Sequence, residues 1–128
     1  MISMNSLIDR LANVAAVASR KIVSLAHLRS NVATKSDQTP VTQVDMIVSQ
    51  YLESTLPQVL DVPVVSEESS LVTHVERRQW CAYWLVDPLD GTKDFIAGKP
   101  GVAVNIALMI DHRPAMGVIA GPFVDSLY

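Results

Sequence analysis

Cysteine is almost absent from the sequence, since Cys81 is the single one among 128 residues. An internal disulfide is therefore excluded, and the composition fits a reducing compartment such as the cytoplasm. No histidine lies near Cys81 in the sequence. We therefore expect its thiol to be a small buried group rather than a nucleophile or a metal ligand.

Basic residues are also few, with ten Lys and Arg against thirteen Asp and Glu and a formal net charge of −3. A nucleic-acid polymer is excluded as a partner, because such binding needs a basic surface. No apolar run reaches the roughly 18 residues needed to span a bilayer, and the first ten residues lack the basic start of a signal peptide. The sequence predicts a cytoplasmic protein without an integral membrane segment, which leaves peripheral association with the inner membrane open.

Hydrophobic residues make up 49% of the chain, which is enough for a packed core, and the length fits one domain. Two amphipathic helices are predicted in the first half. One runs from a Ser6 cap to about His27, and the other starts near Thr42 and closes at Leu56–Pro57. Asp45 lies three residues after Thr42, so the two side chains can form a reciprocal capping box. Between the helices, residues 29–40 are polar and predict a loop with room for a short hairpin.

Apolar runs with a different period fill the second half and predict strands. A short turn at 111–113 joins two of these strands and favours an antiparallel hairpin. Helices followed by strands indicate an α+β fold, with the N-terminal helices packed on a mainly antiparallel sheet. The expected strands span 62–65, 83–86, 102–110, 113–120 and 123–128.

The last expected strand runs to Tyr128 with no helix or turn after it. An open sheet that ends this way leaves an unpaired edge. We therefore expect residues 1–128 to be the N-terminal, metal-binding domain of a longer fold whose C-terminal domain is absent. The open edge is a candidate surface for self-association.

Acidic residues follow two of these strands and are the candidate chemistry of the chain. Glu67 and Glu68 come after one strand, and Asp87 and Asp90 come after the next. Hard oxygen ligands gathered at one point suit Mg²⁺ or Mn²⁺. The hydroxyl of Thr92 stands close by, so the pattern points to metal-assisted hydrolysis of a phosphate ester.

An ordinary turn explains part of the same pattern equally well. Asp-Pro and Asp-Gly pairs are common between strands, and local spacing alone does not separate a turn from a site. Gly91 adds a position where the backbone can approach a ligand closely. A calcium EF-hand is excluded, because Leu89 and Gly91 occupy positions where that loop needs oxygen ligands.

Three segments together resemble the inositol monophosphatase superfamily, whose members are Mg²⁺-dependent, lithium-sensitive phosphatases. They are Thr39-Pro40-Val41-Thr42 with Asp45, then Glu67-Glu68-Ser69, and then Trp84 to Phe95, which contains Asp-Pro-Leu-Asp-Gly-Thr. The run from Lys35 to Thr42 and the residues Gly-Thr-Lys-Asp-Phe are most similar to the 3'(2'),5'-bisphosphate nucleotidase branch, of the bacterial CysQ type. The resemblance implies the first half of an αβαβα layered sugar-phosphatase fold and a role in sulfur metabolism.

The resemblance also implies a role for each matching residue. Carboxylates of Glu67, Asp87 and Asp90 and the main-chain carbonyl of Leu89 would bind metal, with two or three Mg²⁺ ions in a complete site. Asp45 and Thr92 would form a hydrogen-bonded pair that orients and deprotonates the attacking water with Glu67. The implied contacts to the phosphate ester come from Glu67, Leu89, Asp90, Gly91 and Thr92.

The chain departs from the family pattern in two places. It contains no Trp-Asp-x-Ala-type segment, which in the family completes a metal site. Residues 98–102 also replace the Gly-Glu-Phe-like stretch of the nucleotidases. Three hypotheses follow: removal of the 3'-phosphate from adenosine 3',5'-bisphosphate, inositol monophosphatase activity, or a non-catalytic remnant that binds metal weakly.

Overall fold

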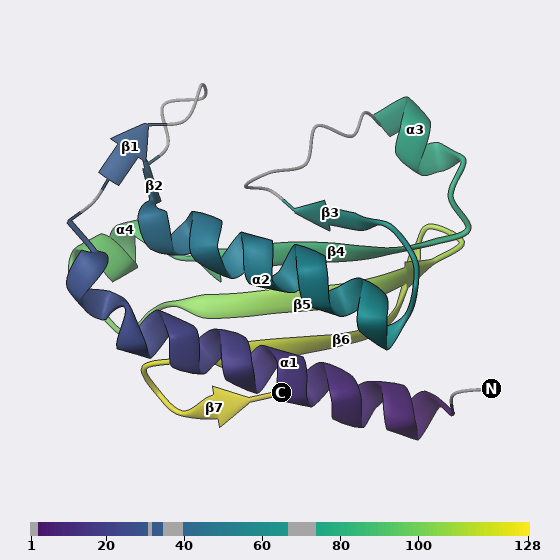
Figure 1. Cartoon of the computed structure of the whole chain (residues 1–128), viewed down its shortest axis with the longest axis horizontal. Helices are drawn as coiled ribbons and strands as arrows, with labels where there is room; N and C mark the ends of the chain where they lie inside the picture. The colour runs from purple at the N-terminus through teal and green to yellow at the C-terminus, as the bar shows by residue number, and fades with distance from the viewer. Residues whose placement is uncertain (1–2, 31, 35–39, 67–73) are drawn as a thin grey trace.

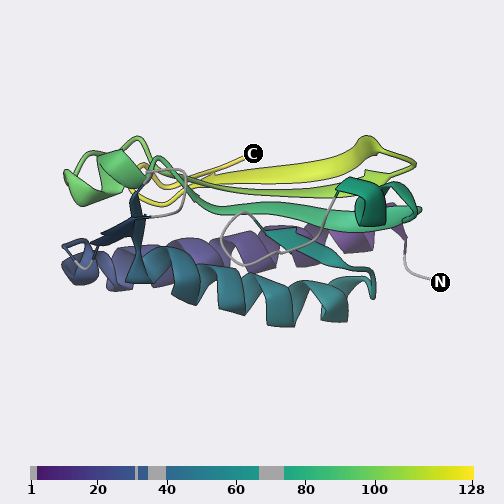
Figure 2. The same cartoon turned by 90° about the horizontal axis from the view of Figure 1, so that it is seen from above.

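Two helices lie side by side over one face of a five-stranded sheet (Figures 1 and 2). The computed structural model describes residues 3–30, 32–34, 40–66 and 74–128. Helix α1 spans Met4–Ser24 and helix α2 spans Gln43–Val59. None of the described helices is long and apolar enough to cross a membrane.

The sheet has the strand order β3-β4-β5-β6-β7. Strand β3 runs parallel to β4, and every other neighbouring pair is antiparallel, which confirms the predicted α+β class with a mainly antiparallel sheet. A separate antiparallel pair, β1 with β2, forms the short hairpin allowed for between the helices. The strands are β1 (Val32–Thr34), β2 (Pro40–Thr42), β3 (Val64–Ser66), β4 (Ala82–Asp90), β5 (Ala103–Ile110), β6 (Arg113–Gly121) and β7 (Ser126–Leu127).

Three short helices were not predicted, because segments of three to five residues are too short to show a period. They are η1 (Ala26–Leu28), α3 (His74–Arg78) and α4 (Thr92–Ile96). The strand half of the chain therefore also contains helices. Strand β7 is likewise shorter than the predicted 123–128 segment.

The predicted helix ends were partly wrong. Helix α1 begins before Ser6, because Ser3 is the cap and its hydroxyl accepts a hydrogen bond from the Ser6 amide at 3.1 Å. Helix α2 continues through Pro57, since Leu56 and Val59 both belong to its buried stripe and packing outweighs the local preference.

Cys81 also departs from expectation, because its thiol is exposed. It lies just before β4, where its carbonyl accepts a hydrogen bond from the amide of Asp111 at 2.8 Å. A position at the end of a hairpin ladder is set by backbone pairing, so the side chain need not enter the core.

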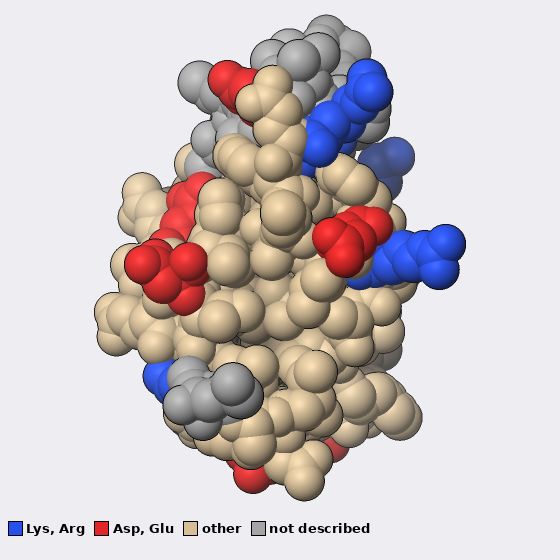
Figure 3. Space-filling view, turned by 90° about the vertical axis from the view of Figure 1, so that its right-hand side faces the viewer, with Lys and Arg blue, Asp and Glu red and all other residues tan. Residues whose placement is uncertain are grey.

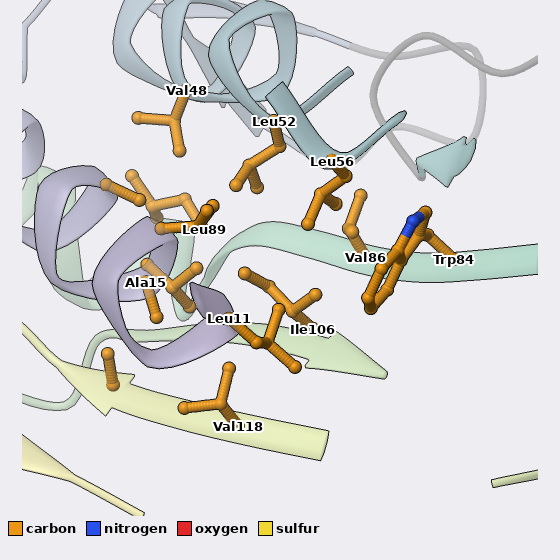
Figure 4. Packing of buried hydrophobic residues seen from close by; sticks show 14 of the residues in the cluster. Leu11, Ala15, Val48, Leu52, Leu56, Trp84, Val86, Leu89, Ile106 and Val118 are labelled. Carbon is orange, nitrogen blue, oxygen red and sulfur yellow. The ribbon is translucent and has the colours of Figure 1, made fainter. Parts of the chain in front are cut away.

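The core lies between the helix pair and the sheet (Figure 4). Trp84 of β4 is fully buried there, and its indole nitrogen donates to the Leu60 carbonyl at 3.1 Å. That bond satisfies the one polar group that the side chain would otherwise bury unpaired. Other fully buried side chains come from both layers, namely Ala15, Ala18, Ile22, Val44, Val48, Leu52, Leu56 and Val104.

The opposite face of the sheet is uncovered in the described part of the chain. Leu85, Ile119 and Tyr128 are 37%, 50% and 82% exposed, and they surround a hollow of about 640 Å³. The alternation of β5 explains the two faces, because Val104 and Ile106 point to the helices while the residue between them, Asn105, points to the hollow.

The turn from β4 into α4 depends on a glycine. Gly91 has φ +91°, in the left-handed region, and a Cβ there would clash with the Gly101 carbonyl oxygen. The Gly91 carbonyl accepts a hydrogen bond from the Phe95 amide at 2.9 Å, which starts α4. Gly91 therefore sets the angle at which the following helix leaves the sheet.

Truncating a buried core side chain should lower the free energy of unfolding, because it leaves a cavity. Leu52→Ala should lower the free energy of unfolding by about 2–5 kcal/mol, because a buried side chain is lost and its space is refilled only in part. Leu127→Ala is the matched control, since Leu127 is 47% exposed, and it should change stability by less than about 0.5 kcal/mol. Urea denaturation of both variants measures the difference, and equal losses would contradict the packing described.

Gly91 and Gly98 both have a left-handed backbone conformation. Substituting each with alanine compares backbone strain alone with strain plus a steric clash. Gly98 has φ +73°, but a Cβ there would meet only the Arg29 side chain, at 3.4 Å. Gly98→Ala should cost about 1–2 kcal/mol from strain alone. Gly91→Ala should cost more, since it strains the backbone and also displaces the 101 peptide. Thermal unfolding of both variants measures this order, and the reverse order would refute it.

Candidate active site

Asp45 is a fully buried carboxylate in the first turn of α2, at 0% exposure. Its Oδ2 accepts hydrogen bonds from the Thr42 amide, at 2.8 Å, and from the Thr42 hydroxyl. In return the Asp45 amide donates to Thr42 Oγ1 at 3.2 Å, which completes the predicted capping box. A buried charge is costly unless it is hydrogen-bonded, and these donors together with the positive end of the helix stabilise this one.

The other oxygen of the same carboxylate, Oδ1, accepts a hydrogen bond from α4. Thr92, the first residue of α4, donates its hydroxyl to Asp45 Oδ1 at 3.0 Å. The two residues are 47 positions apart in the sequence. Asp45 is therefore both a helix cap and the expected partner of Thr92, and it holds α4 against the start of α2.

The Leu89 carbonyl lies beside this pair. Thr92 Oγ1 is 3.3 Å from that carbonyl oxygen, farther than from Asp45. A hydroxyl has one proton to donate, so the shorter bond to Asp45 leaves the lone pairs of the carbonyl available. The Leu89 side chain meanwhile is buried in the core at 2% exposure, which fixes the position of its peptide.

Two further carboxylates lie in the last residues of β4 rather than beyond its end. Asp87 is half-buried and pairs across the ladder with Asn105 of β5, while Asp90 is exposed and pairs with Ala103. The register shifts between the two aspartates, which marks an irregularity such as a β-bulge. Both acids therefore belong to the strand end that leads into α4, which begins at Thr92.

The donors at this corner are all oxygen atoms, from two carboxylates, a peptide carbonyl and a hydroxyl. Oxygen ligands of these kinds are those that Mg²⁺ prefers in proteins. Glu67 and Glu68, the other predicted acids, lie outside the described residues. Within residues 3–30, 32–34, 40–66 and 74–128, no three His, Cys, Asp or Glu side chains form a metal-binding group. The described residues thus supply part of the predicted ligand set.

Two side-chain contacts were not predicted from the sequence. Asn105 Nδ2 donates to Asp90 Oδ2 at 3.4 Å, a long hydrogen bond across the strands. Ser49 and Ser66 are buried and their hydroxyls lie 2.8 Å apart, joining α2 to the end of β3. A polar residue inside an apolar strand was the available signal for Asn105. Nothing in the sequence pairs the two serines.

Curated proteins are similar to this chain in sequence. The chain is 35% identical over 130 residues to the 3'(2'),5'-bisphosphate nucleotidase CysQ of Haemophilus influenzae, with all of this chain and 48% of that protein covered. It is 43% identical over 98 residues to the same-named protein of Aggregatibacter actinomycetemcomitans, covering 76% of this chain and 36% of that one. The chain spans about half the length of the curated relatives it matches.

Solved structures share the fold. CysQ from Bacteroides thetaiotaomicron superposes with a TM-score of 0.76 at 35% identity, over 93% of this chain and 43% of that one. The extragenic suppressor protein suhB from Bartonella henselae gives a TM-score of 0.82 at 28% identity, over 95% of this chain and 47% of that one.

The family assignment rests on nearly the whole chain. The sequence profile of the inositol monophosphatase family matches residues 4–128, which include Asp45, Asp87, Asp90 and Thr92. Because the match covers the helices, the sheet and the corner where these residues meet, the chain belongs to the inositol monophosphatase family.

Proposed function

We propose that the chain carries the N-terminal part of the active site of a Mg²⁺-dependent phosphatase. Its proposed reaction removes the 3'-phosphate of adenosine 3',5'-bisphosphate and yields AMP and phosphate. The observation that carries this proposal is the hydrogen bond from Thr92 to the buried Asp45, beside the Leu89 carbonyl. Asp87 and Asp90 belong to the same strand end as Leu89. The printed names of the CysQ relatives support the choice of substrate.

The proposed metal ligands in the described part of the chain are Asp87, Asp90 and the carbonyl of Leu89. Glu67 is the proposed fourth ligand and also a partner in activating water. Magnesium, when bound, polarises the phosphate ester and lowers the pKa of water. A complete site would contain two or three ions.

Thr92 and Asp45 are the proposed groups that move the proton. The Thr92 hydroxyl donates to Asp45, so its own lone pairs are turned outward and can accept a hydrogen bond from a water molecule. As that water attacks phosphorus, its proton can pass through Thr92 to the carboxylate. The amides of Gly91 and Thr92, at the start of α4, are the proposed contacts to the phosphate.

Two alternatives remain distinct hypotheses. The family description names inositol monophosphatase, so an inositol phosphate is the second candidate substrate. A non-catalytic chain that binds metal weakly and self-associates is the third hypothesis. Measured turnover on adenosine 3',5'-bisphosphate and on inositol 1-phosphate separates all three.

Removal of one ligand should abolish activity. Asp90→Asn keeps the size of the side chain but removes a negative charge from the metal site, so phosphate release should fall to background. Asp61→Asn, at an exposed residue outside the site, should retain full activity. Release is measured with Mg²⁺ and adenosine 3',5'-bisphosphate, and EDTA should stop it.

Each result of this assay has a definite reading. Full turnover by Asp90→Asn would overturn the metal-ligand role. Wild-type release no greater than that of the mutant would favour the non-catalytic hypothesis.

The Thr92 hydroxyl is tested by deletion and rescue. Thr92→Ala should lower kcat by about 10²–10⁴-fold, the usual contribution of general acid–base catalysis. Thr92→Ser keeps the hydroxyl and should recover most of kcat, with KM little changed in both variants. A serine variant as slow as the alanine variant would show that the methyl packing of Thr92 matters and its hydroxyl does not.

A further inference from the structure

A second hollow lies at the far end of the sheet, away from the candidate active site. It is lined by Arg77, Arg78, Tyr83 and His112 and has a volume of about 380 Å³. Strand β4 separates the two places, since Tyr83 is near its start and Asp90 is its last residue. At about 3.3 Å per residue these positions are about 23 Å apart. The hollow is therefore a separate feature of the molecule.

Positive charge concentrates around this hollow. Arg77 and Arg78 come from α3 and His112 from the turn between β5 and β6, so segments distant in sequence converge on it. The neighbouring acids Glu76 and Asp111 are exposed and do not line it. Figure 3 views this end of the molecule, where most of the visible Lys and Arg side chains lie on the right and Asp and Glu side chains also appear on the same face.

Arg77 is half-buried, and part of its guanidinium group is covered. Its Nε is buried and has no hydrogen-bond partner among the described residues. A buried donor without a partner costs about 1–3 kcal/mol, and more for a charged group. Because this Nε has almost no accessible surface, an anion in the hollow would accept from the terminal nitrogens of the Arg77 guanidinium instead.

His112 and Tyr83, which also line the hollow, are held in position by contacts within the chain. His112 Nε2 donates to the Arg78 carbonyl at 3.2 Å, because a carbonyl can only accept. His112 also has φ +63°, in the left-handed region of the backbone, where Asn, Asp and His are the most frequent residues after glycine. Tyr83 is 7% exposed, and its ring lies 6.0 Å from that of Trp80 between centroids. The walls of the hollow are thus fixed by a turn, a hydrogen bond and ring packing.

We propose that this hollow binds the phosphate group of a small phosphorylated molecule. Two guanidinium groups match the paired oxygens of a phosphate, and the Tyr83 phenol supplies a further donor. His112 contributes by holding the Arg78 backbone through its hydrogen bond. The volume lies in the range of ligand pockets and leaves room for an organic group beside the phosphate. This site needs no metal and is independent of the proposed phosphatase activity.

The test is calorimetric titration of the purified chain in EDTA, which keeps the candidate metal site empty. Inorganic phosphate is one probe and AMP is the other, with chloride as the reference anion. Saturable phosphate binding is expected, with tighter binding of AMP if the organic group contributes. Arg77→Gln and Arg78→Gln should each weaken binding about tenfold or more, the loss expected for one charge-assisted hydrogen bond.

Two variants serve as controls. Arg113→Gln removes an equal charge from the same hairpin outside the hollow, so it should change affinity by less than about twofold if the lining residues bind the anion. His112→Asn suits the turn and removes the imidazole, so it should weaken binding while the chain stays folded, as judged by circular dichroism.

The location of binding is read by NMR. Phosphate should shift the amide and side-chain signals of Arg77, Arg78 and His112, and not those of Asp90 or Thr92. Absence of saturable binding at tens of millimolar phosphate would overturn the proposal. So would an Arg113→Gln loss as large as that of Arg77→Gln, or shifts confined to the Asp90 corner.

Discussion

The buried carboxylate of Asp45 is the interaction on which the candidate site depends. One of its oxygens takes part in the cap at the start of α2, and the other accepts a hydrogen bond from the Thr92 hydroxyl. A charge buried at 0% exposure is stable only while its hydrogen bonds persist, so helix, turn and strand end must meet in one geometry. The requirement that stabilises the fold here is the same one that positions the polar groups for chemistry.

The packing of the helices on the sheet holds the end of β4 in position. Trp84 and its neighbours bury β4 against α2, while α1 packs on β5 and β6. Asp87 and Asp90 lie farther along β4, at its end. The apolar half of β4 is thus packed in the core, whereas the register shifts in the half that contains Asp87 and Asp90. Gly91 then allows the sharp exit into α4, because a side chain there would meet the Gly101 peptide. A stable core and an acidic corner follow one another along a single strand.

The two ends of the sheet have opposite electrostatic character. Carboxylates occupy the corner near α4, and Arg77, Arg78 and His112 occupy the hollow near α3. At about three Debye lengths apart in physiological salt, the two clusters interact only weakly. Between them, the exposed face around Leu85 and Ile119 remains an apolar surface.

The sequence by itself determined the two long helices, the antiparallel hairpin and the Thr42–Asp45 capping box, because each depends on residues close together in the chain. It also marked Asp87, Asp90 and Thr92 as candidates through one short motif. The pair of Thr92 with Asp45 was predicted through the family resemblance and not through local pattern, and the structure contains this hydrogen bond. Only the tertiary structure brought Asn105 to Asp90, since that pair depends on strand register. The continuation of α2 through Pro57 and the convergence of Arg77 and His112 likewise depended on packing between distant segments, which local pattern does not encode.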